Sequence, residues 1–183
     1  PTAPLNQVAL FLGWSVHNDT AYDNTAIWLH VASGTTGRAD RTGRVIPVLI
    51  VRIPLIVVAA ILSAARFGAS WMLPVLLGVG LGILFTGLGL SSVGSAQFPY
   101  PAVRPGDSPF AAPQSVGTAS SLIQSLSFFV TIVLVSPTLL FATLALFYPG
   151  WWDWAALLSG LGLGSLFLWL GIDWGGRIFE RRG

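Results

Sequence analysis

The stretch Val45–Ala65, VIPVLIVRIPLIVVAAILSAA, decides the fold of this chain. It is a continuous apolar run in which Arg52 is the one charged residue. A helix rises about 1.5 Å per residue, so about 20 apolar residues are enough to cross the roughly 30 Å hydrocarbon core of a bilayer. Arginines lie on both sides of the run, at Arg44 and Arg66. The stretch is therefore predicted to be a transmembrane helix.

The composition of the whole chain also indicates a membrane environment. Of its 183 residues, 54% are hydrophobic and 9% are charged, whereas a soluble domain has about 25% charged residues. Such a chain has too little polar surface to cover itself in water. Its apolar segments are long continuous runs and not short alternating strands, which favours helices over a barrel. We predict an all-α, polytopic transmembrane helix bundle that forms a single domain.

About four full spans are predicted, preceded by a partial one. The full spans are expected at 45–65, 71–95, 116–148 and 155–172. The apolar run at residues 8–16 is too short to cross a bilayer. We interpret it as the tail of an upstream span, with an interfacial segment as the alternative. Because the chain starts with Pro1 and has no basic-then-apolar signal segment, we expect it to be the C-terminal part of a longer protein.

The arginines predict the orientation of these spans. If the loop at 17–44 faces the cytoplasm, the same side also receives Arg104 and the C-terminal arginines, and the other side receives only Arg66. This is the positive-inside bias of membrane proteins. Dividing 116–148 at Pro137 into two spans would move the C-terminal arginines to the other side, so a single span is favoured. The C-terminus is then cytoplasmic.

No catalytic, cofactor-binding or metal site is predicted. The chain has no Cys and no Lys, which excludes a thiolate metal site and a phosphate-binding loop of the Gly-Lys-Ser/Thr type. His17 and His30 lie near Asp19 and Asp23, but a solvated loop is favoured over a metal or acid–base site. The small net charge of +2 gives no reason to expect nucleic acid as a partner.

Two features inside the spans have structural or functional interpretations. Gly78 and Gly82 are four residues apart, as are Gly160 and Gly164, and such pairs let helix backbones approach closely in lipid. Packing within the chain is favoured, with dimerisation as the alternative. Arg52 is a costly charge inside a span. We weigh two interpretations of it equally: a residue of a translocation path, and a side chain that extends to the headgroups.

The residues AYDNTAIWLHVASGTTGRADRTGRVIPVLIVRIPLIVV, 21–58, resemble the middle of exporter-type ABC transporter permeases from high-GC bacteria. In those permeases an acidic residue and then an aromatic one precede a small-residue, basic loop and a span. Asp23, Trp28 and the arginines at 38–44 occupy those places. The resemblance continues at residues 90–114, LSSVGSAQFPYPAVRPGDSPFAAPQ, with an FPYP loop that several such permeases share.

The resemblance implies a permease subunit in a bacterial plasma membrane that works with a cytoplasmic ABC ATPase, as a dimer of permease halves. ATP and magnesium would bind to the ATPase, and this chain would not itself be an enzyme. The segment 20–44 would couple the two proteins, with these coupling candidates: Asp23, Trp28, His30, Arg38, Arg41 and Arg44. The alternatives are an ATP-independent transporter or channel subunit, and a membrane-embedded enzyme.

Overall fold

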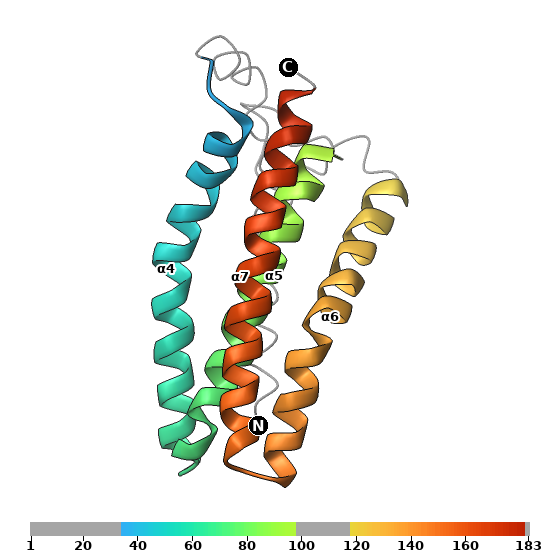
Figure 1. Ribbon diagram of the computed structural model, residues 1–183. Helices are drawn as coiled ribbons and strands as arrows, with labels where there is room; N and C mark the ends of the chain where they lie inside the picture. The colour runs from blue at the N-terminus through green and yellow to red at the C-terminus, as the bar shows by residue number, and fades with distance from the viewer. Residues whose placement is uncertain (1–33, 98–117, 182–183) are drawn as a thin grey trace.

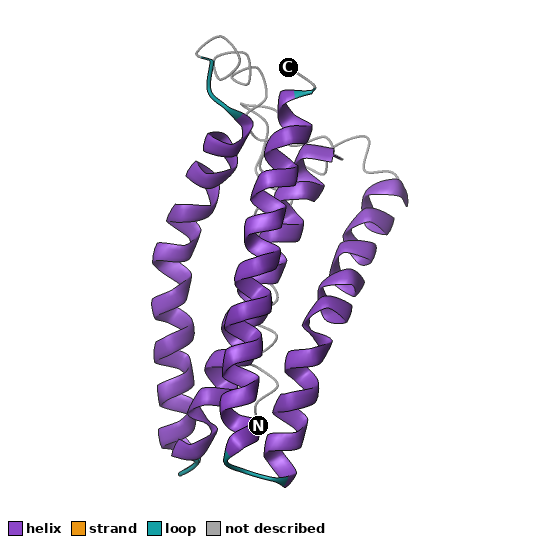
Figure 2. Ribbon diagram, viewed as in Figure 1, coloured by secondary structure: helices purple, strands orange, loops and turns teal. Residues whose placement is uncertain are grey.

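The structure, a computed structural model, describes residues 34–97 and 118–181. Within these two ranges the chain forms helices and no strand (Figures 1 and 2). The four long helices are each long and apolar enough to cross a membrane. The predicted all-α bundle is therefore confirmed. The elements are α4 (Gly37–Arg66), the short 3-10 helix η2 (Ser70–Met72), α5 (Leu73–Gln97), α6 (Thr118–Phe147) and α7 (Trp151–Glu180).

The four helices run alternately up and down the bundle. In Figure 1, α4 and α6 start at the upper end, whereas α5 and α7 start at the lower end. The upper end holds the start of α4 and the end of α7, and we name it the basic end because it carries these described arginines: Arg38, Arg41, Arg44, Arg177 and Arg181. The lower end, named the far end, has Arg66 and the connection between α6 and α7.

α5 lies at the centre of the bundle. In its most apolar stretch 72% of the residues are buried, against 17–22% in the corresponding stretches of α4, α6 and α7. A helix that is apolar on every face suits this position. The other three helices turn large apolar side chains outward, such as Ile50, Phe129 and Leu158. In water these would form an extensive exposed apolar surface, but in a bilayer lipid chains cover them.

A seam of small residues joins α5 to α7, which run in parallel. Gly78 lies against the backbone of Ala156 and Gly160, and a Cβ on Gly82 would be 3.0 Å from the Cα of Gly160. Gly164 faces Gly82 in turn. All four glycines singled out from the sequence thus lie in this one intramolecular seam. Without side chains between them the two backbones come into direct contact, which is the usual basis of helix association in lipid.

The first span is longer than predicted, because α4 starts at Gly37 and not near Val45. The segment expected to be a glycine-rich loop up to Arg44 is therefore helical from Gly37 onward. Thr36 caps the helix: it has an extended backbone, and its Oγ1 accepts a hydrogen bond from the N–H of Ala39 at 3.3 Å. A capping threonine satisfies one of the free N–H groups of the first turn, and this outweighs the low helix propensity of Gly37.

The last span also exceeds its predicted bounds, 155–172, at both ends. α7 starts at Trp151 because the Asp153 carboxylate accepts a hydrogen bond from the N–H of Gly150 at 2.8 Å and so fixes the first turn. Gly150 itself has φ 120°, a conformation that glycine adopts readily. At its C-terminus α7 continues to Glu180, where it meets the start of α4.

Candidate functional site at the basic end

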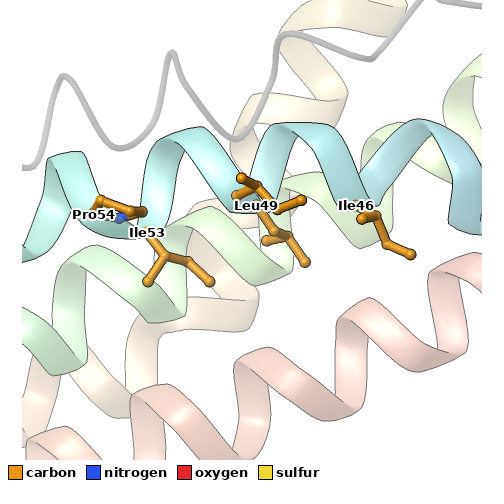
Figure 3. Close-up of a pocket in the computed structure, with 5 residues that line it drawn as sticks. Ile46, Leu49, Ile53 and Pro54 are labelled. Atoms are coloured by element: carbon orange, nitrogen blue, oxygen red, sulfur yellow. The ribbon is translucent and has the colours of Figure 1, made fainter.

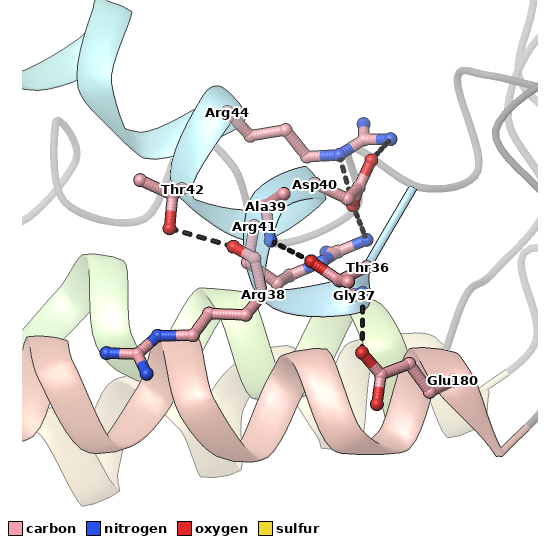
Figure 4. A network of polar contacts seen from close by, with 9 residues as sticks. All are labelled: Thr36, Gly37, Arg38, Ala39, Asp40, Arg41, Thr42, Arg44 and Glu180. Carbon is pink, nitrogen blue, oxygen red and sulfur yellow. Dashed lines mark hydrogen bonds and ion pairs between the residues drawn. The ribbon is translucent and has the colours of Figure 1, made fainter. Parts of the chain in front are cut away.

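The centre of the basic end is one buried carboxylate that holds two arginines. The side chain of Asp40 is 2% exposed, and its Oδ2 lies 2.8 Å from Nη2 of Arg41. Nε and Nη2 of Arg44 donate to the two oxygens of the same carboxylate, each at 3.0 Å (Figure 4). This two-pronged arginine–carboxylate geometry is stronger than a single neutral hydrogen bond.

Arg41 is enclosed by protein. Its side chain is 1% exposed, and its guanidinium carbon lies 5.5 Å from the centre of the Phe179 ring on α7. A guanidinium at this distance from an aromatic ring is attracted to the ring face. The family resemblance predicts that Arg41 contacts an ATPase, but a partner protein cannot reach a side chain buried to this extent. The structure instead assigns Arg41 to the contact between α4 and α7.

The backbones of α4 and α7 also meet directly at this end. The carboxylate of Glu180 accepts a hydrogen bond from the N–H of Gly37 at 2.9 Å (Figure 4). The space beside Gly37 is filled by the backbone of Gly176, so that neither glycine could carry a side chain without moving a helix. Three contacts thus hold the start of α4 against the last turns of α7. They are the hydrogen bond from Gly37 to Glu180, the contact of Arg41 with the Phe179 ring, and the backbone contact of Gly37 with Gly176.

Two of the predicted coupling arginines differ in accessibility. Arg38 is exposed, whereas the Arg44 side chain is only 16% exposed and is paired with Asp40. On α7, Arg177 is exposed and forms an ion pair with Asp173 at 2.7 Å. Arg38 and Arg177 therefore present positive charge at the surface. The other coupling candidates, Asp23, Trp28 and His30, lie outside the described residues.

Arg52 lies in the middle of α4, on the side that faces the bundle. Its neighbours on this stripe, Val45 and Ile56, are 2% and 3% exposed. It is about 12 Å along the helix axis from Arg44, the residue before the apolar run. Its Nη1 atom is buried and makes no hydrogen bond to any residue in the described ranges. Both interpretations of Arg52, a residue of a translocation path and a side chain that extends to the headgroups, stay predictions.

Five residues of this site are absent from the sequence predictions: Gly37, Asp40, Gly176, Phe179 and Glu180. The spacing of Asp40 and Arg44, four residues apart, is typical of an ion pair along one helix face and could have indicated that the basic segment is helical. Nothing in the sequence pairs Phe179 or Glu180 with α4, because those contacts depend on how the helices pack. Within the described ranges no three His, Cys, Asp or Glu residues come together as a metal site.

Comparison with known proteins identifies no relative: no protein-family model, no curated protein and no solved structure matches the chain. What can be said of its function therefore depends on its residues and their geometry.

Proposed function

We propose that this chain is the membrane-spanning permease subunit of an ATP-driven ABC exporter, with its basic end in the cytoplasm of a bacterium. In this proposal a cytoplasmic ATPase binds at the segment 20–44, and a second permease half completes the transporter. The residues at 21–58 and 90–114 support the family, because they resemble such permeases. The distribution of the described arginines supports the orientation, because positively charged ends of membrane helices favour the cytoplasm.

The observation that carries the proposal is the attachment of α4 to α7 at the basic end. The segment 20–44, which resembles an ATPase-coupling element, includes Gly37, and Gly37 contacts Glu180 and Gly176. A displacement of that segment would therefore move the start of α4 and the end of α7 together. Such a mechanical connection is what a permease needs if an ATPase is to drive its spans between two arrangements.

Co-purification with candidate ATPases tests the proposal. Arg38→Glu reverses an exposed charge at the basic end and is expected to weaken the complex, because Arg38 is accessible to a partner. Trp28→Ala is expected to weaken it as well. Arg66→Glu, at the far end of the same helix, is the matched control and should leave the complex intact. If the Arg38 and Trp28 variants retain the ATPase as well as the unchanged protein does, the proposed docking is wrong.

The second candidate is an ATP-independent transporter, and Arg52 is the observation that favours it. Carriers that use ion gradients frequently have ionisable residues inside their spans. Reconstitution of the protein alone separates the two candidates. Transport without any ATPase would support the second candidate and contradict the exporter.

A further inference from the structure

α6 packs against the bundle along only part of its length. From Thr131 onward its buried side chains follow one helical face, at Thr131, Val135, Thr138 and Ala145. Before Thr131 no described side chain of α6 is buried, and Phe129 is 63% exposed. In Figure 1, α6 diverges from α7 toward the basic end. The first turns of α6 therefore have few packing contacts within the described chain to fix their position.

The last turns of α6 are held to α7 by two specific contacts. The hydroxyl of Ser159 donates a hydrogen bond to Oγ1 of Thr138 at 3.2 Å, and Thr138 is 1% exposed. Nearer the far end, the rings of Phe141 and Trp152 stack with their centres 5.9 Å apart. Hydrogen bonds between hydroxyl groups and contacts between aromatic rings both stabilise helix pairs in a bilayer. By contrast, the open surface of α4 around Ile46, Leu49 and Ile53 carries only aliphatic side chains (Figure 3).

Pro137 directly precedes Thr138, the first residue of α6 with a specific contact to α7. A proline inside a helix removes one backbone hydrogen bond, and its ring crowds the carbonyl four residues earlier, which here belongs to Val133. The Ser136 hydroxyl donates to that carbonyl at 2.7 Å, and hydroxyl groups that bond back to the helix often bend it. Sharp bends in helices occur mostly at prolines. Pro137 thus weakens the helix where its held part begins.

We propose that α6 is a hinged helix: residues 118–135 bend at Pro137 away from and back toward α5 and α7, while residues 138–147 stay in place. The movement exposes two described buried side chains, Thr131 and Val135, and neither is large. The Thr131 hydroxyl donates to the carbonyl of Ser127 at 2.8 Å, within α6 itself, so it leaves the bundle without losing this hydrogen bond. The bundle then opens sideways at the basic end. The hinge does not depend on the proposed ATPase partner.

Distances between pairs of spin labels, measured by double electron–electron resonance on the full protein in nanodiscs, test the hinge. The chain has no cysteine, so each pair of introduced cysteines is labelled alone. Ile46→Cys with Leu126→Cys joins α4 to α6 toward the basic end, and Leu62→Cys with Leu146→Cys joins them at the far end, all at exposed positions. A bend of about 20° at Pro137 displaces residue 126 by about 6 Å, because it lies about 16 Å along the helix from the proline. The distance distribution is therefore expected to be clearly wider for the first pair.

Replacement of the proline separates the hinge from general flexibility. Pro137→Ala supplies the missing N–H and is expected to narrow the distribution of the first pair to the width of the far-end pair. Pro54→Ala, which removes a proline inside α4, is the matched control and should leave both distributions unchanged. Equal widths of the two pairs in the unchanged protein would overturn the inference. So would a first-pair distribution that stays wide in Pro137→Ala, or one that narrows in Pro54→Ala.

A second variant tests the contact that holds the last turns of α6, and it decides the matter if Pro137→Ala does not fold. Thr138→Val keeps the size of the side chain but removes the hydrogen bond with Ser159. It is expected to widen the distribution of the far-end pair, because the held part of α6 is then released from α7. A far-end distribution that stays as narrow as in the unchanged protein would show that Thr138 does not hold α6, and would overturn the inference.

Discussion

At Asp40 a buried carboxylate forms ion pairs with two guanidinium groups. Asp40→Asn should therefore destabilise the protein by about 3–5 kcal/mol, the usual cost of removing one partner from a buried ion pair. Denaturant or thermal unfolding in detergent measures this loss. Asp173→Asn is the control, since its partner Arg177 is 66% exposed and an exposed pair contributes about 0–1 kcal/mol. Equal effects of the two variants would contradict the role given to Asp40.

At Gly160 the backbone of α5 occupies the position that a side chain would need. Gly160→Ala should force α5 and α7 apart and destabilise the protein by about 1–3 kcal/mol, as overpacking does. Gly162 lies two residues further on α7, exposed and with open space beside it. Gly162→Ala should be neutral or stabilise the helix by up to about 1 kcal/mol. Unfolding of the two variants under one condition checks the difference, and a harmless Gly160→Ala would contradict the seam.

For single residues, the sequence can indicate a role in packing but not the partner that the residue contacts. The spacing of Gly78, Gly82, Gly160 and Gly164 indicates that they pack helices, because small residues four apart have few other uses in an apolar helix. The spacing does not indicate which helix each one meets. The resemblance implies that Arg41 contacts an ATPase, whereas the structure shows its side chain buried against Phe179, which is far away along the chain. Contacts between distant segments leave no local pattern to read.

Among the elements, α6 shows how a helix can continue through a proline inside a membrane. Pro137 has no N–H to donate to the carbonyl of Val133. The hydroxyl of Ser136 donates to that carbonyl instead, at 2.7 Å. The predicted single span at 116–148 accordingly agrees with one helix, Thr118–Phe147. The sequence favours this result through the distribution of charge, and the hydroxyl provides its local physical reason.

A double-mutant cycle tests this explanation of α6. Ser136→Ala should destabilise the protein by about 1 kcal/mol, since it removes the hydrogen bond to an otherwise unpaired carbonyl. The same change in a Pro137→Ala background should have almost no effect, because an alanine at that position would supply the missing N–H. Unfolding of the four proteins gives the coupling energy. Equal losses in both backgrounds would show that the Ser136 hydroxyl does not replace the missing donor.

The helix bounds show which features of an element the sequence can predict. The apolar length of each span is clear, because hydrocarbon thickness sets it. The predicted ends lie too far inward at α4 and α7, where polar residues continue the helix beyond the apolar run. Thr36 and Asp153 fix those ends by capping. Each cap is a single polar residue outside the apolar run. A prediction based on long apolar runs therefore does not locate it.

In the whole molecule, four apolar helices form a bundle suited to a membrane, and the basic residues of α4 and α7 share one end of it. Composition predicts the bundle, and the arginines predict the arrangement of its ends. The proposed function adds that the basic end is cytoplasmic. All of them require the described helices to cross the bilayer as an alternating set.

Labelling of single cysteines tests this claim most directly, because the chain has no cysteine of its own. Arg38→Cys and Arg181→Cys place a thiol at the basic end, and Phe67→Cys and Tyr148→Cys place one at the far end, all at exposed positions. With a membrane-impermeant maleimide, the first two should react from the cytoplasmic side and the other two from the opposite side. Reaction of positions 38 and 181 from opposite sides would contradict the arrangement.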